Sequence, residues 1–134
     1  MNTTHCICII DDDPIHIFTT KRILQMEKIC DKILVFKDGK EAYDGLKKMI
    51  TDNDELPKLI LLDLNMPIWD GWDFLDEFTK IEKSKEIKIL INSSSQAIED
   101  LNRAKSYEMV DGFIYKPFTI EQFKQEFEFG FRKN

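Results

Sequence analysis

The sequence lacks the features of a membrane or secreted protein. None of its apolar runs approaches the roughly 20 residues that a transmembrane helix needs. The first ten residues, MNTTHCICII, have neither the basic start nor the long apolar core of a secretory signal. Cysteine is also scarce: Cys6, Cys8 and Cys30 are an odd number, and the first two are badly placed in an expected strand to bond each other. We therefore expect a cytoplasmic protein with reduced cysteines.

Clustered positive charge is missing as well. The chain carries 25 acidic and 19 basic residues, its net charge is −6, and the basic residues are scattered. The electrostatic signature of a nucleic-acid-binding protein is therefore absent. At 134 residues the chain is too short for two ordinary domains, so we expect a single domain over 1–134 with one functional surface.

Short aliphatic or β-branched runs alternate with longer segments of helical periodicity. This alternation is typical of a parallel sheet with crossover helices. The expected strands are 6–10, 32–36, 58–63, 87–92 and 112–116, and the expected helices are 14–28, 39–51, 72–82, 96–107 and 120–131. The third and fourth strands are nearly continuous apolar runs, which indicates central strands covered on both faces.

Several expected helices begin with a capping residue. The caps are Asp13 before Pro14, Asp38 with Glu41, and Thr119 with Gln122. We also expect Ser95 to cap the fourth helix. Each of the first three caps follows an expected strand, which supports the strand-then-helix order.

Polar residues gather where the expected strands end. Ligands of open α/β sheets bind beyond the carboxyl ends of the strands. Asp11, Asp12 and Asp63 would meet there, and such close carboxylates repel one another unless a cation neutralises them or a pKa rises. A ligand set of oxygen atoms, without histidine or cysteine at the same edge, favours Mg²⁺ over zinc or copper.

The same edge offers groups suited to phosphoryl chemistry. Lys116 supplies a positive charge and Ser93 a hydroxyl, and both could contact the oxygens of a phosphoryl group. A carboxylate can accept a phosphoryl group as an acyl phosphate. Asp63 is the natural acceptor because it follows a buried strand and precedes a turn.

Four segments carry a family resemblance. IIDDDP, LLDLNMPIWDG, ILINSSS and YKPF resemble, in order, the signature blocks of the response-regulator receiver domain of two-component signalling. The resemblance implies a flavodoxin-like, CheY-like fold: a doubly wound, five-stranded parallel sheet in the order 2-1-3-4-5 with five helices. It also implies a stand-alone receiver, because the chain leaves no room for an output domain.

The resemblance assigns the acidic residues their roles. Asp63 is similar to the phosphorylated aspartate of the family. Asp12 matches the direct metal ligand, Asp11 supports it, and Asn65 would offer its backbone carbonyl to the same Mg²⁺.

It also assigns the switching residues. Ser93 matches the switch hydroxyl, and Phe113 occupies the position of the aromatic switch residue. Lys116 matches the lysine of the family, and its bond to Pro117 is expected to be cis.

The implied partners are proteins. A histidine kinase or phosphotransfer protein would supply the phosphoryl group, and a downstream target would read the surface formed by residues 96–107, 112–116 and 120–131. We expect only self-phosphorylation and self-dephosphorylation, not turnover of other substrates. Nucleic-acid and membrane partners are not expected, and homodimerisation stays open because the family dimerises through several faces.

Two other functions are compatible with parts of the sequence. A receiver-like module can bind partners without phosphorylation, but the usual sign is loss of an acid, the acceptor or the lysine. An aspartate-nucleophile Mg²⁺ phosphatase would carry its nucleophile in a D-x-D motif after the first strand, whereas this chain has D-D-D there and Asp63 on the third strand. His16 has no metal-ligand partner at helical or strand spacing, so we expect it to be structural or exposed.

Overall fold

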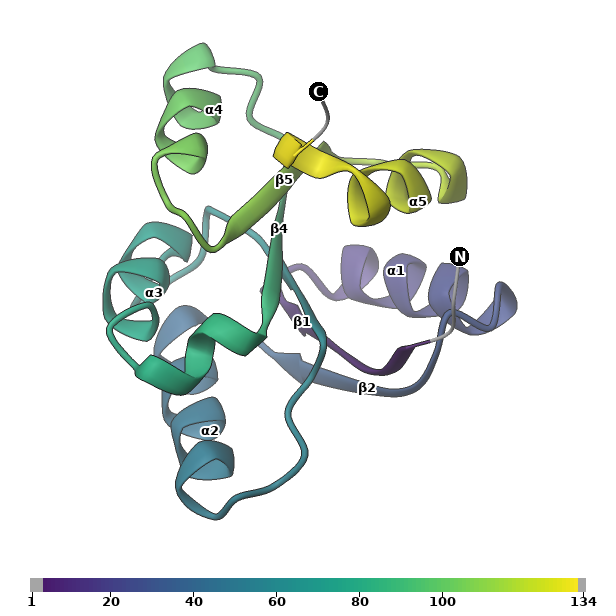
Figure 1. Cartoon of the computed structure of the whole chain (residues 1–134). Coiled ribbons are helices and arrows are strands. Elements are labelled where there is room, and N and C mark those ends of the chain that lie inside the picture. Colours follow the sequence, from purple (N-terminus) through teal and green to yellow (C-terminus); the bar gives the residue numbers. More distant parts are fainter. Residues whose placement is uncertain (1–3, 133–134) are drawn as a thin grey trace.

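The computed structural model describes residues 4–132, in which strands and helices alternate (Figure 1). The strands are β1 (Thr4–Ile10), β2 (Cys30–Phe36), β3 (Leu59–Leu62), β4 (Lys88–Ser93) and β5 (Val110–Tyr115). The α-helices are α1 (Pro14–Met26), α2 (Gly39–Thr51), α3 (Gly71–Phe78), α4 (Ile98–Lys105) and α5 (Ile120–Glu128), and the short 3₁₀ helices are η1 (Glu82–Glu86) and η2 (Gly130–Arg132). None of the helices within residues 4–132 is long and apolar enough to span a membrane.

The strands form one parallel sheet in the order β2-β1-β3-β4-β5. This confirms the predicted fold and strand order. The last residue of β1, Ile10, pairs with Leu62, the last residue of β3. The backbone N–H of Asp63 then donates to the Ile10 carbonyl oxygen at 2.9 Å. Asp11 and Asp63 therefore leave the sheet on neighbouring strands, at the same edge.

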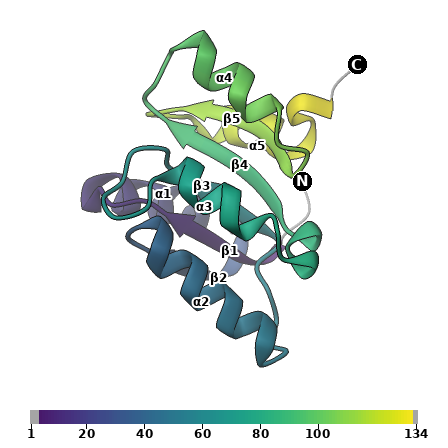
Figure 2. The same ribbon diagram turned by 90° about the vertical axis from the view of Figure 1, so that its left-hand side faces the viewer.

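Helices cover both faces of the sheet (Figures 1 and 2). Helices α1 and α5 lie on one face, and α2, α3 and α4 lie on the other. The first core contains Ile7, Ile9, Leu24, Leu61 and Phe123, and the second contains Cys8, Ile10, Leu46, Leu62 and Phe74. Every residue of β3 is buried, which explains the continuous apolar run at this position.

The three predicted caps are confirmed. Asp13 accepts hydrogen bonds from backbone N–H groups of the first turn of α1, and Asp38 does the same for α2. Thr119 forms a reciprocal capping box on α5. A further box, between Asp70 and Asp73, starts α3 at Gly71 and was not expected from the sequence.

The predicted role of Ser95 as the cap of α4 is wrong. The N-cap is Ala97, which has no side-chain cap hydrogen bond. The Ser95 hydroxyl instead donates to Asp100 Oδ2 at 2.5 Å, and it accepts from the Ala97 N–H at 3.3 Å. Helix α4 begins only at Ile98, so the Ser95 hydroxyl lies outside the first helical turn, where a carboxylate is its stronger partner.

Candidate functional site

Three carboxylates meet beyond the carboxyl ends of β1 and β3. Oxygen atoms of Asp11, Asp12 and Asp63 all lie within 4.8 Å of one another. The side chains of Asp11 and Asp63 are almost completely buried, whereas Asp12 is exposed. The β1–β3 pairing brings these residues together because each carboxylate group directly follows a strand end, as the sequence predicted.

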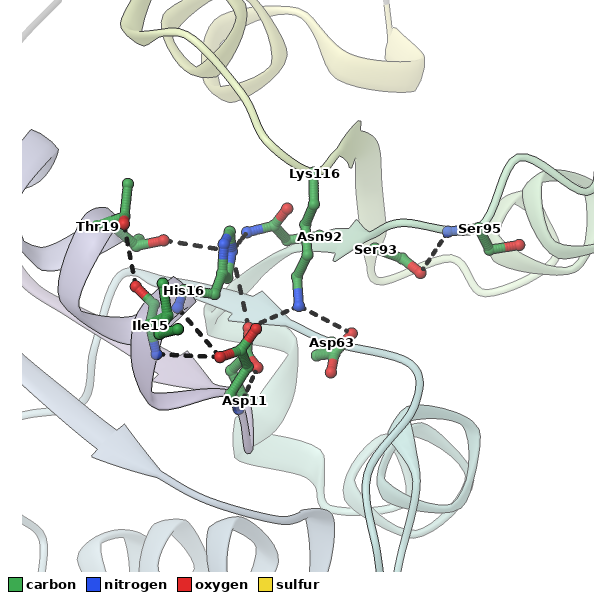
Figure 3. Close-up of polar contacts among 11 residues, drawn as sticks. Asp11, Ile15, His16, Thr19, Asp63, Asn92, Ser93, Ser95 and Lys116 are labelled. Atoms are coloured by element: carbon green, nitrogen blue, oxygen red, sulfur yellow. Dashed lines mark hydrogen bonds and ion pairs between the residues drawn. The ribbon is translucent and has the colours of Figure 1, made fainter.

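Lys116 crosses this cluster from the end of β5 (Figure 3). Its Nζ atom is 2.9 Å from Asp11 Oδ2 and 3.4 Å from Asp63 Oδ1. The Lys116 backbone N–H donates to the Ser93 carbonyl oxygen at 2.9 Å, which fixes the lysine to the end of β4. The Lys116–Pro117 peptide bond is cis, as expected.

The charges at this site do not balance. Three carboxylates face one ammonium group. Burial raises the pKa of the Asp63 carboxyl to about 6; Lys116 opposes this rise, the charge of Asp11 adds to it, and hydrogen bonds from Lys116 and the Asn65 N–H oppose it. Asp63 is therefore mostly ionised at neutral pH, but its charge is poorly compensated.

This donor set fits a hard divalent cation. The cluster offers carboxylate oxygen only, with no histidine nitrogen or cysteine sulfur among its ligands. Mg²⁺ prefers such oxygen ligands and is held by a few carboxylates together with waters or phosphate oxygens. A cation would also supply the positive charge that three carboxylates and one lysine lack.

The loop after β4 is held by hydrogen bonds between its own residues and α4. The side chain of Ser93 is fully buried, and its Oγ atom accepts a hydrogen bond from the Ser95 N–H at 3.1 Å. Ser95 is held in turn by Asp100 on α4. The predicted switch hydroxyl thus lies next to the acidic site and is engaged within its own loop.

The other two predicted residues are Asn65, which contacts Asp63 through its backbone, and Phe113 on β5. Asn65 is exposed and directs its backbone N–H at Asp63. Phe113 on β5 is buried, and its ring packs on Tyr115 with centroids 5.1 Å apart. Their places are compatible with the expected roles, which remain predictions.

His16 and Asn92 also belong to this region. The strand-end pattern places Asn92 at this edge of the sheet, but the sequence did not indicate His16 or its contact with Asn92. His16 Nε2 is 2.7 Å from Asn92 Nδ2 and 3.7 Å from Asp11 Oδ2 (Figure 3). The two residues are 76 positions apart, so no local spacing connects them. The available signal was weak: Asn92 is a polar residue at the end of the apolar strand KILIN.

Comparisons with known proteins agree on one family. The model of the response regulator receiver domain matches residues 7–128. The probable methanogenesis regulatory protein FilR2 of Methanothrix harundinacea is 29% identical, over 91% of this chain and 78% of that protein. Chemotaxis protein CheY-3 of Vibrio cholerae is 28% identical, over 96% of this chain and 92% of that protein. Several other relatives are longer, and the chain spans less than half of their length.

A solved structure shows the same architecture. The crystal structure of a two-component response regulator from Cytophaga hutchinsonii superposes with a TM-score of 0.87 at 26% identity. The match covers 95% of this chain and 96% of that chain. The sheet and the edge that carries the carboxylates therefore belong to a recurring scaffold.

Proposed function

This chain belongs to the response regulator receiver family of two-component signalling, and on that premise we propose that it accepts a phosphoryl group on Asp63 in a Mg²⁺-dependent reaction. One observation carries the proposal. The buried Asp63 carboxyl group lies 3.4 Å from Lys116 Nζ and shares its site with two further acids. Phosphoryl transfer needs in-line positioning of an attacking group and neutralisation of the phosphoryl oxygens. Asp63 would supply the attacking oxygen, and Lys116 with a cation on the acids would supply the positive charge.

The acceptor reaction follows from the charge and position of Asp63. An ionised Asp63 oxygen attacks the phosphorus of the donor, the bond from phosphorus to the leaving group breaks, and an acyl phosphate forms. Lys116 contacts the phosphoryl oxygens with its ammonium group. A Mg²⁺ ion held by Asp11, Asp12, Asp63 and the Asn65 carbonyl would offset negative charge on the same oxygens. The product is a modified protein, so the chain acts as a signalling phosphoacceptor.

Switching follows from the loop after β4. We infer that Ser93 leaves the Ser95 N–H and turns its hydroxyl toward the new phosphoryl oxygens. The Ser95 hydroxyl is hydrogen-bonded to Asp100 on α4, so a movement of Ser93 and Ser95 would displace α4. Phe113 would adjust its packing next to the shifted loop. The surface formed by α4, β5 and α5 then changes between two states that a partner can distinguish.

The phosphodonor partner would be a histidine kinase or a phosphotransfer protein. Large apolar side chains are exposed on the segments that follow the acids. Ile15 and Phe18 on α1 are 76% and 64% exposed, and Ile68, in the loop after β3, is 76% exposed. Such side chains favour docking of a protein surface over capture of a small phosphate ester. A downstream protein, or a second copy of the chain, would use the α4–β5–α5 surface.

A direct test uses a small phosphodonor. The protein is incubated with Mg²⁺ and acetyl phosphate, and its intact mass is followed together with that of Asp63→Asn. The exposed Asp44→Asn on α2, which loses the same charge, serves as the control. We expect the wild type and the Asp44 variant to gain one phosphoryl group with release of acetate, and the Asp63 variant to gain none.

Two results would contradict the proposal. If the wild type gains no phosphoryl mass, or if the Asp63 variant gains it equally, Asp63 is not the acceptor. Steady hydrolysis of many phosphoesters would instead favour the phosphatase alternative.

A further inference from the structure

His16 lies at the inner edge of the acidic site and contacts three elements through one nitrogen (Figure 3). Its Nε2 atom is 2.7 Å from Asn92 Nδ2 on β4. The same atom is 3.3 Å from Thr20 Oγ1, one turn further along α1. It is also 3.7 Å from Asp11 Oδ2, the oxygen that Lys116 contacts at 2.9 Å. Lys116 and His16 thus both face the same oxygen, Asp11 Oδ2.

The contacts of His16 adjoin other residues of the site. Asn92 directly precedes Ser93 on β4. The imidazole also packs edge-on against Phe118, two residues after Lys116, with ring centroids 6.2 Å apart. A change in the position of His16 would therefore displace residues at the ends of β1, β4 and β5, which carry the predicted chemistry.

Asn92 takes up the hydrogen-bonding capacity of His16 Nε2. The amide nitrogen of Asn92 can only donate, so this contact requires His16 Nε2 to accept, and the proton of the neutral ring is then on Nδ1. A nitrogen of a neutral imidazole makes one in-plane hydrogen bond, as donor or as acceptor. Asn92 occupies that position at 2.7 Å, and the Thr20 hydroxyl is the more distant partner at 3.3 Å. The distance of 3.7 Å to Asp11 is too long for a hydrogen bond.

Packing alone does not account for an amide at position 92. The preceding β4 residues Ile89, Leu90 and Ile91 are fully buried and apolar. Asn92 is only 3% exposed, and its Oδ1 atom has no hydrogen-bond partner in the described part of the chain. A buried amide with one free polar atom costs stability relative to an aliphatic side chain. The contact with His16 is the compensating interaction that the structure records.

We propose that Asn92 engages His16 so that Lys116, and not His16, pairs with Asp11. This inference rests on the function proposed above, and it makes His16 and Asn92 positioning residues for the phosphoryl acceptor. Without Asn92, the proton of the neutral ring moves to Nε2, and Nε2–H donates to Asp11, because a carboxylate is the strongest acceptor within its reach. His16 then shares Asp11 Oδ2 with Lys116, which weakens the Lys116–Asp11 contact and lets Lys116 move toward the Asp63 oxygen that has to attack the donor.

The proposal predicts that a second substitution rescues the first. Asn92→Val frees His16, and the rate of phosphorylation by acetyl phosphate at saturating Mg²⁺ falls about fivefold or more. Adding His16→Leu removes the competitor for Asp11, and the rate returns to within about twofold of the wild type. Rates are measured below the unfolding temperature of every variant, so a loss of stability alone does not alter them.

Nitrogen-15 NMR of the imidazole gives a readout that a packing role would not change. We expect His16 to carry its proton on Nε2 in Asn92→Val, with a hydrogen bond to Asp11. If Asn92→Val does not fold, Asn92→Thr replaces it with the same expectation, since its hydroxyl ends one atom short of the amide nitrogen.

The outcomes separate this inference from the proposed function. A wild type that gains no phosphoryl group overturns the proposed function and this inference with it. An active wild type with a folded Asn92→Val of equal rate overturns the inference alone. The same holds if the double variant stays as slow as Asn92→Val.

Discussion

The ammonium group of Lys116 lies closer to Asp11 than to Asp63, with Nζ–Oδ distances of 2.9 Å and 3.4 Å. Asp11 therefore anchors the lysine, and Asp63 has the longer contact with it. A carboxylate that is not tightly paired keeps more of its nucleophilic character. The lysine nevertheless stays near enough to contact oxygens attached to Asp63.

Replacement of Asp63 should stabilise the metal-free protein at neutral pH. The folded state raises the pKa of this carboxyl from 3.8 to about 6, so ionising it costs the folded state more than the unfolded chain. The wild type therefore loses stability as the pH rises through 6. We expect Asp63→Asn to be more stable by up to about 3 kcal/mol at pH 7.

Urea unfolding of both proteins in EDTA tests this prediction. The difference between wild type and Asp63→Asn should shrink toward zero as the pH falls from 7 to about 4, where both states protonate the carboxyl. A difference that does not change with pH would show that charge is not its cause.

Mg²⁺ should stabilise the folded protein through Asp12. A ligand that binds only the folded state at ten times its Kd adds about 1.4 kcal/mol. We expect Asp12→Asn to lower the affinity for Mg²⁺ about tenfold or more, and EDTA to remove the stabilisation of the wild type. Thermal unfolding across a Mg²⁺ titration measures both effects.

Asp13→Asn is the matched control for that experiment. It removes the same charge one position away, and asparagine remains a good N-cap. An Asp13 variant that loses the Mg²⁺ effect as fully as the Asp12 variant would contradict the assigned ligand.

Removal of the lysine should destabilise the protein through the buried acids. Lys116→Met leaves Asp11 and Asp63 without their ammonium partner, and we expect a loss of about 2–4 kcal/mol at pH 7 without metal. Adding Asp63→Asn should recover a large part of this loss. A double-mutant cycle from urea unfolding gives the coupling, and additive losses would argue against a direct interaction.

Gly71 should be irreplaceable because of its contact with the acceptor. A Cβ atom at this position would lie 2.5 Å from the Asp63 carbonyl oxygen and 2.9 Å from Leu64 Cα, both backbone atoms. Gly71→Ala should therefore cost about 1–3 kcal/mol and slow phosphorylation by displacing Asp63.

Gly45→Ala is the comparison for that variant. Its Cβ atom would meet the side chain of Phe36, which is only partly buried and can turn aside. It also lies inside α2, where alanine is favoured over glycine. A smaller loss for Gly71→Ala than for Gly45→Ala, by urea unfolding, would contradict the argument.

The acidic site was predictable because it follows from strand ends. Asp11, Asp63 and Lys116 each come directly after an apolar strand, and parallel strands bring such ends to one edge. The sheet order needed the family resemblance, because the sequence pattern gives the elements but not their neighbours.

The parts that could not be predicted depend on tertiary contacts. His16 and Asn92 meet across α1 and β4, and neither has a local pattern that identifies the other. The role of Ser95 was predicted wrongly because α4 begins two residues later than a cap at this position requires, and its hydroxyl donates to Asp100 instead. Helix caps inside a short local window, such as Asp13, were correct because their partners are two or three residues away.

Asp13 has two connections that are usually made by separate residues. Its backbone N–H donates to Asp11 Oδ1 at 2.9 Å, and its carboxylate accepts from the Ile15 N–H at 3.0 Å. A ligand that binds the Asp11 carboxylate would change the environment of the Asp13 amide directly, and that of the Ile15 amide through Asp13. The first turn of α1 is thus a natural place for a spectroscopic reporter, whose amide resonances would register cation binding at the Asp11 carboxylate.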